Sequence, residues 1–167
     1  IMKVIFLDID GVLIPLLNKT PENADFSLSY MDRAKSMLSQ DACFSLAKIL
    51  SDPSVWIVVS SSLSHHWEWL KELLSSVPTM QNDTIWDRVI SKTWEKTWGW
   101  RSTEILMWLN EYHRTARFWY HVTHWVAIDD EFFDMKAISR MWRLIKTDGY
   151  VGLTDEQAYE IISLLNH

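Results

Sequence analysis

Two aspartates with the spacing of a catalytic pair, Asp8 and Asp10, directly follow a short apolar run that begins at Val4. Such a run bounded by glycine is typical of a buried strand. The two carboxylates are therefore expected at its C-terminal end, where Gly11 permits a sharp turn. With one carboxylate attacking and the other moving protons, the pair suits acyl or phosphoryl transfer. The alternative is that both aspartates only cap the end of the strand.

Polar side chains also follow two later apolar runs. Three serines at 60–62 follow the run 55–59, and two aspartates at 129–130 follow the run 125–128. In a doubly wound sheet, ligands bind outside the carboxyl ends of the strands, so all three polar groups are expected at one edge if the strands are adjacent. Carboxylates gathered there would repel one another without a counter-ion, and hard oxygen ligands of this kind favour Mg²⁺.

The elements that must position these side chains alternate along the chain. Besides the first strand, we expect strands over 55–59, 85–90, 125–128 and 142–145. Helices are expected over 31–50 (with a break near 39–41), 65–74, 102–113, and from a capping box at 154–157 onward. The stretch 12–30 reads as a loop or flap over the site. This alternation predicts a single α/β domain over 1–167, a Rossmann-like doubly wound parallel sheet in three α/β/α layers.

Composition narrows the class of protein. The chain has 167 residues, a net charge of −6 and one cysteine, Cys43. No stretch approaches the about 20 apolar residues of a membrane span, and no cleavable leader is expected where the first strand begins. The lone cysteine forms no internal disulfide, which fits a reducing cytoplasm. The acidic balance argues against a basic nucleic-acid clamp.

Three groups of residues leave alternatives open. The 11 tryptophans are expected mostly in packing, with stacking platforms for bases as the alternative. The pairs 65–66 and 121/124 place histidines close together, but no cysteine cluster accompanies them, so packing is favoured over zinc binding. The acidic net charge also leaves open a local basic patch, formed by Lys92, Lys96, Arg101, Arg114 and Arg117.

The segment from Asp8 to Gly11 resembles the first motif of the haloacid dehalogenase (HAD) superfamily, whose phosphatase branch carries Asp-x-Asp-Gly. The resemblance implies that Asp8 is the nucleophile and forms an aspartyl-phosphate. It also implies that Asp10 protonates the leaving group and later activates water. The ATP-driven pumps of the superfamily have a different sequence after the nucleophile, so a pump is excluded.

The remaining HAD motifs imply the phosphate-binding residues. The second motif, a serine after an apolar strand, corresponds to Ser61, with Ser60 as the alternative, and Gly11 is placed with the phosphate-binding groups. The third motif is a basic residue that neutralises phosphoryl charge. We assign it to Arg101, with Lys92 and Lys96 as alternatives.

The fourth HAD motif, paired acids after an apolar strand, corresponds to Asp129 and Asp130. The resemblance implies that Mg²⁺ is bound by Asp8, by the backbone carbonyl of Asp10 and by Asp129. Asp130 or Asp134 is expected to support these ligands.

A closer resemblance covers nearly the whole chain. The segments 57–62, 101–109, 128–130, 147–148 and 152–154 look like those of small phage and bacterial HAD domains, relatives of which are fused to RNA-repair modules. This group implies a capless fold, without a second domain over the site. It usually has Trp-Arg after the serines, where this chain has Leu-Ser, so a contact made by that arginine is in doubt.

These features predict a Mg²⁺-dependent phosphomonoesterase. Neither 12–54 nor 64–124 holds a full cap, and an open site suits a large substrate that itself excludes water. A 3′- or 5′-phosphate end of RNA or DNA is the first expectation. The alternatives are a nucleotide or small-metabolite phosphatase that closes a lid over 12–30, and a non-catalytic, Trp-rich binding protein. The sequence does not determine the oligomeric state.

Overall fold

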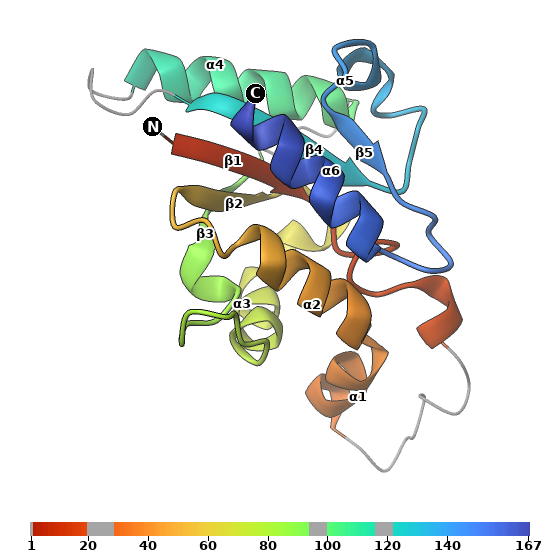
Figure 1. The fold of residues 1–167 in the computed structure, drawn as a ribbon. Helices are drawn as coiled ribbons and strands as arrows, with labels where there is room; N and C mark the ends of the chain where they lie inside the picture. The colour runs from red at the N-terminus through yellow and green to blue at the C-terminus, as the bar shows by residue number, and fades with distance from the viewer. Residues whose placement is uncertain (1, 20–28, 94–99, 116–121) are drawn as a thin grey trace.

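The computed structural model describes residues 2–19, 29–93, 100–115 and 122–167. These ranges form a five-stranded parallel sheet in the order β3-β2-β1-β4-β5 (Figure 1). The strands are β1 (Met2–Leu7), β2 (Val55–Val59), β3 (Val89–Lys92), β4 (Val122–Asp129) and β5 (Leu144–Lys146). The α-helices are α1 (Tyr30–Met37), α2 (Gln40–Ile49), α3 (Trp67–Ser75), α4 (Arg101–Thr115), α5 (Lys136–Arg140) and α6 (Asp155–Asn166). Short 3₁₀ helices are η1 (Leu16–Asn18), η2 (Ser62–His65) and η3 (Trp86–Arg88).

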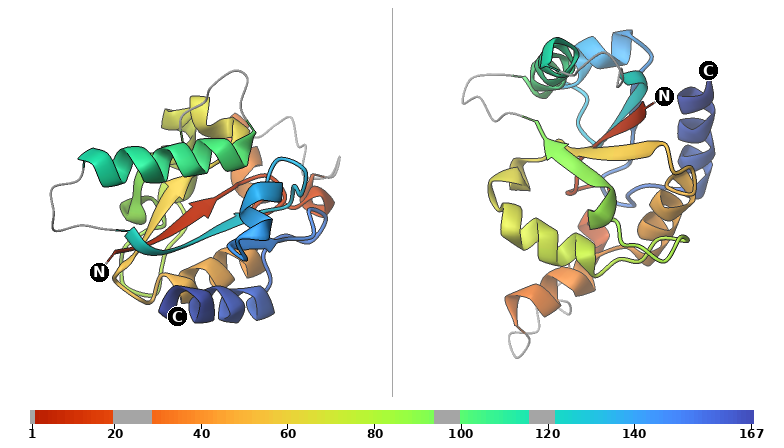
Figure 2. Two further views of the ribbon diagram at one scale, coloured as in Figure 1. Left: turned by 90° about the horizontal axis from the view of Figure 1, so that it is seen from above. Right: turned by 90° about the vertical axis from the view of Figure 1, so that its left-hand side faces the viewer.

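The sheet lies between two layers of helices, as the views along and across it show (Figure 2). Side chains alternate along a strand, and β1 is buried on both faces. Ile5 and Leu7 pack in one core with α2, α3 and α6. Val4 and Phe6 pack in a second core with α4 and α5. The predicted three-layer, doubly wound α/β fold is therefore confirmed.

Local signals in the sequence explain two helix starts. The hydroxyl of Ser39 accepts a hydrogen bond from the Ala42 amide, so α2 begins there as a helix separate from α1. This accounts for the break expected near 39–41. Thr154 and Gln157 form the expected capping box at the start of α6.

The strand predicted over 85–90 is wrong in its position. Residues 86–88 form η3, and the strand that pairs with β2 starts at Val89. The physical reason is Arg88, whose buried side chain donates from Nη2 to the carbonyls of Leu50 and Asp52, each at 2.9 Å. Burying an arginine is costly unless its charge is hydrogen-bonded, and these two contacts to carbonyls fix the chain before the strand begins.

The last strand and its approach also differ from expectation. β5 begins at Leu144 rather than at Trp142, whose φ of 57° lies in the left-handed region and is incompatible with a strand. The short helix α5 was not predicted. Of the expected loop over 12–30, residues 20–28 lie outside the described ranges. Within the described ranges, no helix is long and apolar enough to cross a membrane.

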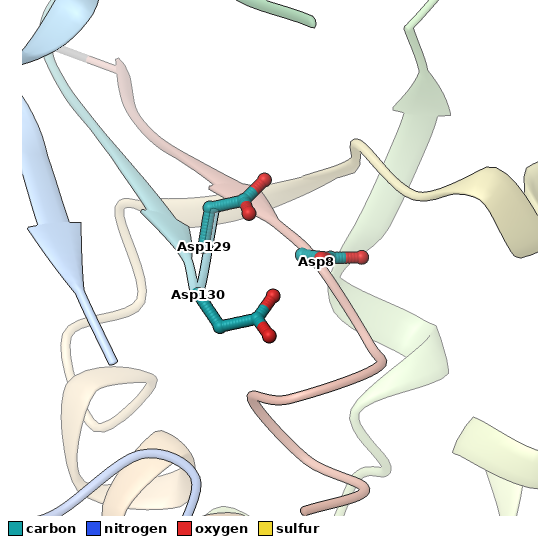
Figure 3. A group of neighbouring side chains, drawn as sticks. All are labelled: Asp8, Asp129 and Asp130. Carbon is teal, nitrogen blue, oxygen red and sulfur yellow. The ribbon is translucent and has the colours of Figure 1, made fainter. Parts of the chain in front are cut away.

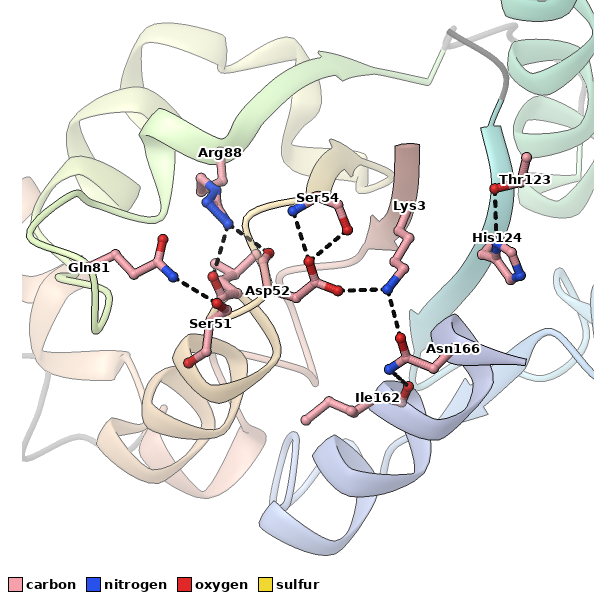
Figure 4. A network of polar contacts seen from close by, with 11 residues as sticks. Lys3, Ser51, Asp52, Ser54, Gln81, Arg88, Thr123, His124, Ile162 and Asn166 are labelled. Carbon is pink, nitrogen blue, oxygen red and sulfur yellow. Dashed lines mark hydrogen bonds and ion pairs between the residues drawn. The ribbon is translucent and has the colours of Figure 1, made fainter. Parts of the chain in front are cut away.

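A polar network ties β1 to the turn before β2 and to the end of α6 (Figure 4). Lys3 Nζ lies 2.6 Å from Asp52 Oδ2 and 2.7 Å from Asn166 Oδ1. The other carboxylate oxygen of Asp52 accepts from the amide and the hydroxyl of Ser54. Burial alone would raise the pKa of Asp52, but these hydrogen bonds outweigh it and lower that pKa from 3.8 to about 2.

We expect Asp52→Asn to lower the free energy of unfolding by about 1 kcal/mol at pH 7. Because the folded-state pKa is depressed to about 2, the contribution is present above the ordinary pKa of an aspartate. It is lost as the pH falls through about 2. Urea denaturation at several pH values should therefore show the wild-type and variant curves converging in acid. A double-mutant cycle with Lys3→Met isolates the ion pair, and a difference independent of pH would contradict this account.

Candidate active site

The polar residues after β1, β2 and β4 lie at one edge of the sheet because the strands pair in register. Leu7 is opposite both Val59 and Ile128. The pairing continues one residue further, since the Asp8 amide donates to the Ile128 carbonyl at 3.0 Å and the Ser60 amide donates to the Leu7 carbonyl at 2.8 Å. The expected convergence of three strand ends is thus present, with β1 in the centre.

Three carboxylates gather at this edge (Figure 3). Asp8 follows β1, while Asp129 and Asp130 stand at the end of β4, and each offers an oxygen within 4.8 Å of the others. Asp8 and Asp129 are buried, whereas Asp130 is half-buried. Among the described histidines, cysteines and acids, this is the group whose geometry could hold a metal ion.

Arg101, the first residue of α4, neutralises part of this charge. Its Nη1 lies 2.8 Å from Asp8 Oδ2 and 2.8 Å from Asp129 Oδ2. The start of α4 is held in place by the Ser102 amide, which donates to the Asp134 carbonyl at 2.9 Å. Asp134 therefore contributes its backbone here, and its side chain is not part of the acidic group defined above.

The two buried carboxylates are still not fully compensated. Burial raises the pKa of Asp8 to about 7, with the charge of Arg101 lowering it and that of Asp129 raising it further. Burial likewise raises the pKa of Asp129 against the lowering effect of Arg101. One guanidinium shared between two carboxylates leaves negative charge at the edge of the sheet, which is what a bound cation requires.

Two glycines leave space for the side chain of Asp130. At Gly11 the φ is 75°, and a Cβ there would stand 2.3 Å from Asp130 Cγ. A Cβ at Gly149 would stand 2.5 Å from Asp130 Oδ2. Glycines on both sides thus leave room for this one carboxylate. The turn after β1 is fixed by Thr147, whose hydroxyl donates to the Gly11 carbonyl at 2.8 Å.

Asp10 stands apart from the buried acids. Its side chain is 39% exposed, and its Oδ1 lies 2.6 Å from the Nζ of Lys19. Lys19 was not singled out from the sequence, because it lies in the loop after the first motif with no spacing rule to connect it to Asp10. The two aspartates of the first motif therefore have different surroundings, as a nucleophile and a separate proton carrier require.

The serines after β2 differ in their contacts. The Ser61 hydroxyl accepts from the Leu63 amide at 3.2 Å, and its hydrogen bond with Asp8 lowers the pKa of that carboxyl. The Ser60 hydroxyl is buried and has no hydrogen-bond partner among the described residues. Ser61, the sequence-based choice for the phosphate-binding serine, is thus the one in contact with Asp8.

The other basic candidates are placed differently from Arg101. Lys92 Nζ donates to the Ser64 carbonyl at 2.8 Å and lies 5.4 Å from the Trp67 ring centroid, so it holds the loop after β2. Lys96 falls outside the described residues, as does Arg117 of the basic patch. Of the two candidates for the third motif that the structure describes, Arg101 is the one that touches the acidic group.

Some contributors could have been found from the sequence and others could not. Thr147 directly follows β5, and its amide donates to the Asp129 carbonyl at 3.0 Å. Had the last strand predicted from the sequence been extended by one residue, Thr147 would have been recognised as another polar residue at a strand end. Gly149 has no sequence signal linking it to Asp130. Its role depends on two loops meeting in space.

The residues present fit a small divalent cation. The donors Asp8, Asp129 and Asp130 are hard carboxylate oxygens, which suit Mg²⁺. Burial raises the pKa of Asp8 and of Asp129, which disfavours their charged forms, and such an ion would stabilise those forms. A cavity of about 730 Å³, lined by Asp10, Gly11, Lys19 and Asp130 among others, leads to this edge of the sheet.

Comparison with known proteins supports one family. The family model described as "HAD domain in Swiss Army Knife RNA repair proteins" matches residues 4–158. No curated protein and no solved structure matches the chain. The matched range includes every residue of the acidic group and Arg101, and it confirms the resemblance drawn from the motifs.

We expect Gly149→Ala to weaken Mg²⁺ binding about tenfold or more, because the added Cβ displaces the Asp130 carboxylate. A bound ion raises the melting temperature by mass action, so thermal melts across a MgCl₂ series measure the effect without an activity assay. Asp130→Asn is the matched control and should lose a similar part of the Mg²⁺-dependent rise. A wild-type response in Asp130→Asn would show that Asp130 is not a ligand, and a wild-type response in Gly149→Ala alone would show that the space at Gly149 is not required.

We expect Arg101→Met, which keeps much of the side-chain volume, to destabilise the protein by about 3 kcal/mol in EDTA. The loss follows from leaving Asp8 and Asp129 buried without a counter-charge. Added Mg²⁺ should restore part of the free energy of unfolding, because the ion replaces the missing positive charge. Equal destabilisation with Mg²⁺ and with EDTA would argue against a cation site beside these carboxylates.

Proposed function

Because the chain belongs to the HAD domain family of Swiss Army Knife RNA repair proteins, a group of phosphatase-type hydrolases, we propose that it is a Mg²⁺-dependent phosphomonoesterase. One observation carries the proposal. Asp8 is buried at the end of the central strand with Arg101 at 2.8 Å, while Asp10, two residues later, reaches a more exposed position beside Lys19. A nucleophile and a separate acid–base group are thus held by a single strand end.

In the proposed reaction, Asp8 attacks phosphorus and the bond to the leaving oxygen breaks, giving an aspartyl-phosphate. Asp10 donates a proton to that oxygen, and then accepts one from the water that hydrolyses the intermediate. The contacts of Arg101 to Asp8 and Asp129 both use Nη1, so among the described residues these carboxylates leave its other N–H groups for phosphoryl oxygens. When bound, a divalent cation neutralises phosphoryl charge.

The serines complete the proposed phosphoryl site. Ser61 is next to Asp8, and its hydroxyl is placed to donate to a phosphoryl oxygen once substrate is present. The buried Ser60 hydroxyl, which has no partner in the described part of the chain, is the second available donor. Preorganised donors of this kind stabilise the charge that develops during phosphoryl transfer.

A large substrate, a nucleic-acid 3′- or 5′-phosphate end, is the substrate class we propose. In the described ranges, the connection from β1 to β2 contains η1, α1 and α2, and that from β3 to β4 contains α4, so neither supplies a separate covering domain. The cavity beside Asp10 is open and measures about 730 Å³. The RNA-repair context named for the family supports nucleic acid as the polymer.

We expect Asp8→Asn to abolish phosphate release and Asp10→Asn to slow it by about a hundredfold or more, with both variants folded. The assay measures inorganic phosphate from 3′- and 5′-phosphorylated oligonucleotides, mononucleotides and p-nitrophenyl phosphate, with Mg²⁺ and with EDTA. Circular dichroism and thermal melts provide the folding control. Full turnover by Asp8→Asn would rule out the aspartyl-phosphate route.

The substrate panel separates the proposal from its alternatives. Metal-dependent release that favours oligonucleotide ends supports end processing. Release from the small esters alone would point to a metabolite phosphatase. If the folded wild-type protein releases phosphate from none of the esters, the remaining alternative is a non-catalytic binding protein with a HAD fold.

A further inference from the structure

A second cavity lies beside Asp10, between α1 and α3. It measures about 220 Å³, and it shares Asp10, Ile14 and Lys19 with the larger cavity at the sheet edge. The rest of its lining is mainly aromatic and apolar, with one arginine: Tyr30, Arg33, Ala34, Met37, Leu63 and Trp69. The carboxylate assigned to proton transfer therefore stands at the junction of two cavities.

Two aromatic side chains form one wall of the smaller cavity. The rings of Tyr30 and Trp69 have centroids 6.0 Å apart and are inclined by 45° to each other. Tyr30 is 69% exposed, although it stands next to the site. Trp69 Nε1 is buried without an acceptor among the described residues, so packing holds that ring. The pair offers an apolar π surface on which a flat ring can stack.

The proton transfer assigned to Asp10 determines which part of the substrate lies against the Tyr30 and Trp69 rings. Asp10 protonates the leaving oxygen, so the leaving group must lie against Asp10 rather than on the side of the attacking Asp8. Besides Asp10, the larger cavity is lined by two acids, Asp130 and Asp148, and by two lysines, Lys19 and Lys146. These charges balance, so they give a phosphodiester chain no net attraction. The smaller cavity has Lys19 and Arg33 as its charged residues besides Asp10.

The size and charge of the smaller cavity fit one base with its backbone. At about 220 Å³ it is smaller than the about 300–1,000 Å³ of sites for whole drug-sized ligands, and so suits a single ring system. Stacking on aromatic side chains accepts any base. Arg33 Cζ lies 6.0 Å from the Tyr30 ring centroid, which places positive charge at the edge of the wall, where a neighbouring phosphodiester would run.

We propose that the cavity lined by Tyr30 and Trp69 is a stacking subsite for the base of the nucleotide that carries the scissile phosphate. This subsite rests on the proposed phosphatase function and makes its substrate class specific. The enzyme recognises the terminal nucleotide of a nucleic-acid end through the face of its base, and it does so without sequence preference.

The test compares two RNA oligonucleotides that carry the same terminal phosphate, one with a normal terminal nucleotide and one with an abasic terminal nucleotide. For wild-type protein, we expect kcat/KM to be about tenfold or more higher on the base-bearing RNA, mostly through KM. Tyr30→Ala and Trp69→Leu should bring this ratio close to one. Trp69→Phe, which keeps a ring, should retain most of it.

The matched control is Tyr159→Ala, which removes an exposed tyrosine from α6 that lines neither cavity. It should keep the wild-type ratio, and thermal melts establish that all variants are folded. The subsite is overturned if wild-type protein hydrolyses both RNAs equally. It is also overturned if Tyr30→Ala keeps the wild-type ratio, or if a phosphotyrosine peptide is a better substrate than the base-bearing RNA.

A binding measurement separates failure of the subsite from failure of the phosphatase proposal. If folded wild-type protein releases phosphate from no ester, the phosphatase proposal fails, and fluorescence anisotropy then measures binding of the two labelled RNAs to Asp8→Asn. Tighter binding of the base-bearing RNA that is lost in Asp8→Asn/Tyr30→Ala supports the subsite. Equal binding of both RNAs overturns it.

Discussion

The shared ion pair of Arg101 with Asp8 and Asp129 is the interaction on which this site depends. In-register pairing of β1 with β4 fixes the backbone of Asp8 beside that of Asp129, and this places two buried carboxylates close together. The guanidinium contacts both at 2.8 Å, yet the pKa of Asp8 stays raised, at about 7. Because burying charge is costly unless it is paired, these carboxylates would be stabilised by further positive charge, which a divalent cation could supply.

Other residues at this edge of the sheet make room for a third carboxylate beside the pair. Glycines at 11 and 149 leave room for Asp130 beside the pair, and Thr147 fixes the turn that carries Gly11. The same turn takes Asp10 out of the buried group and toward Lys19. One strand end therefore supplies two carboxylates with different surroundings, and the division of labour proposed for them follows from their positions rather than from their chemical type.

In the proposed function, the helices beside this edge recognise the substrate. α1 and α3 bring Tyr30 and Trp69 together at the smaller cavity, on which Asp10 also borders. Their rings are far from the strand ends in sequence, and no metal or phosphate chemistry accounts for them. The proposed base-stacking wall would place a polymer substrate next to Asp10, the proposed proton donor, without a separate domain in the described ranges.

The sequence by itself determined the fold class and the acidic end of the site. Apolar runs that end in Asp8, Ser60 and Asp129 are local signals, and in a parallel sheet their polar ends lie at one edge. That they are neighbours there follows from the strand order β2-β1-β4. Tertiary structure decided that Lys19 pairs with Asp10 and that η3 precedes the third strand. It also placed Arg101, the residue preferred from the sequence, rather than Lys92 beside Asp8. Those outcomes depend on which atoms, distant in sequence, pair with a buried charge or with the end of a long side chain. The carbonyls of Leu50 and Asp52, for example, accept hydrogen bonds from Arg88. Sequence spacing carries no information about such contacts.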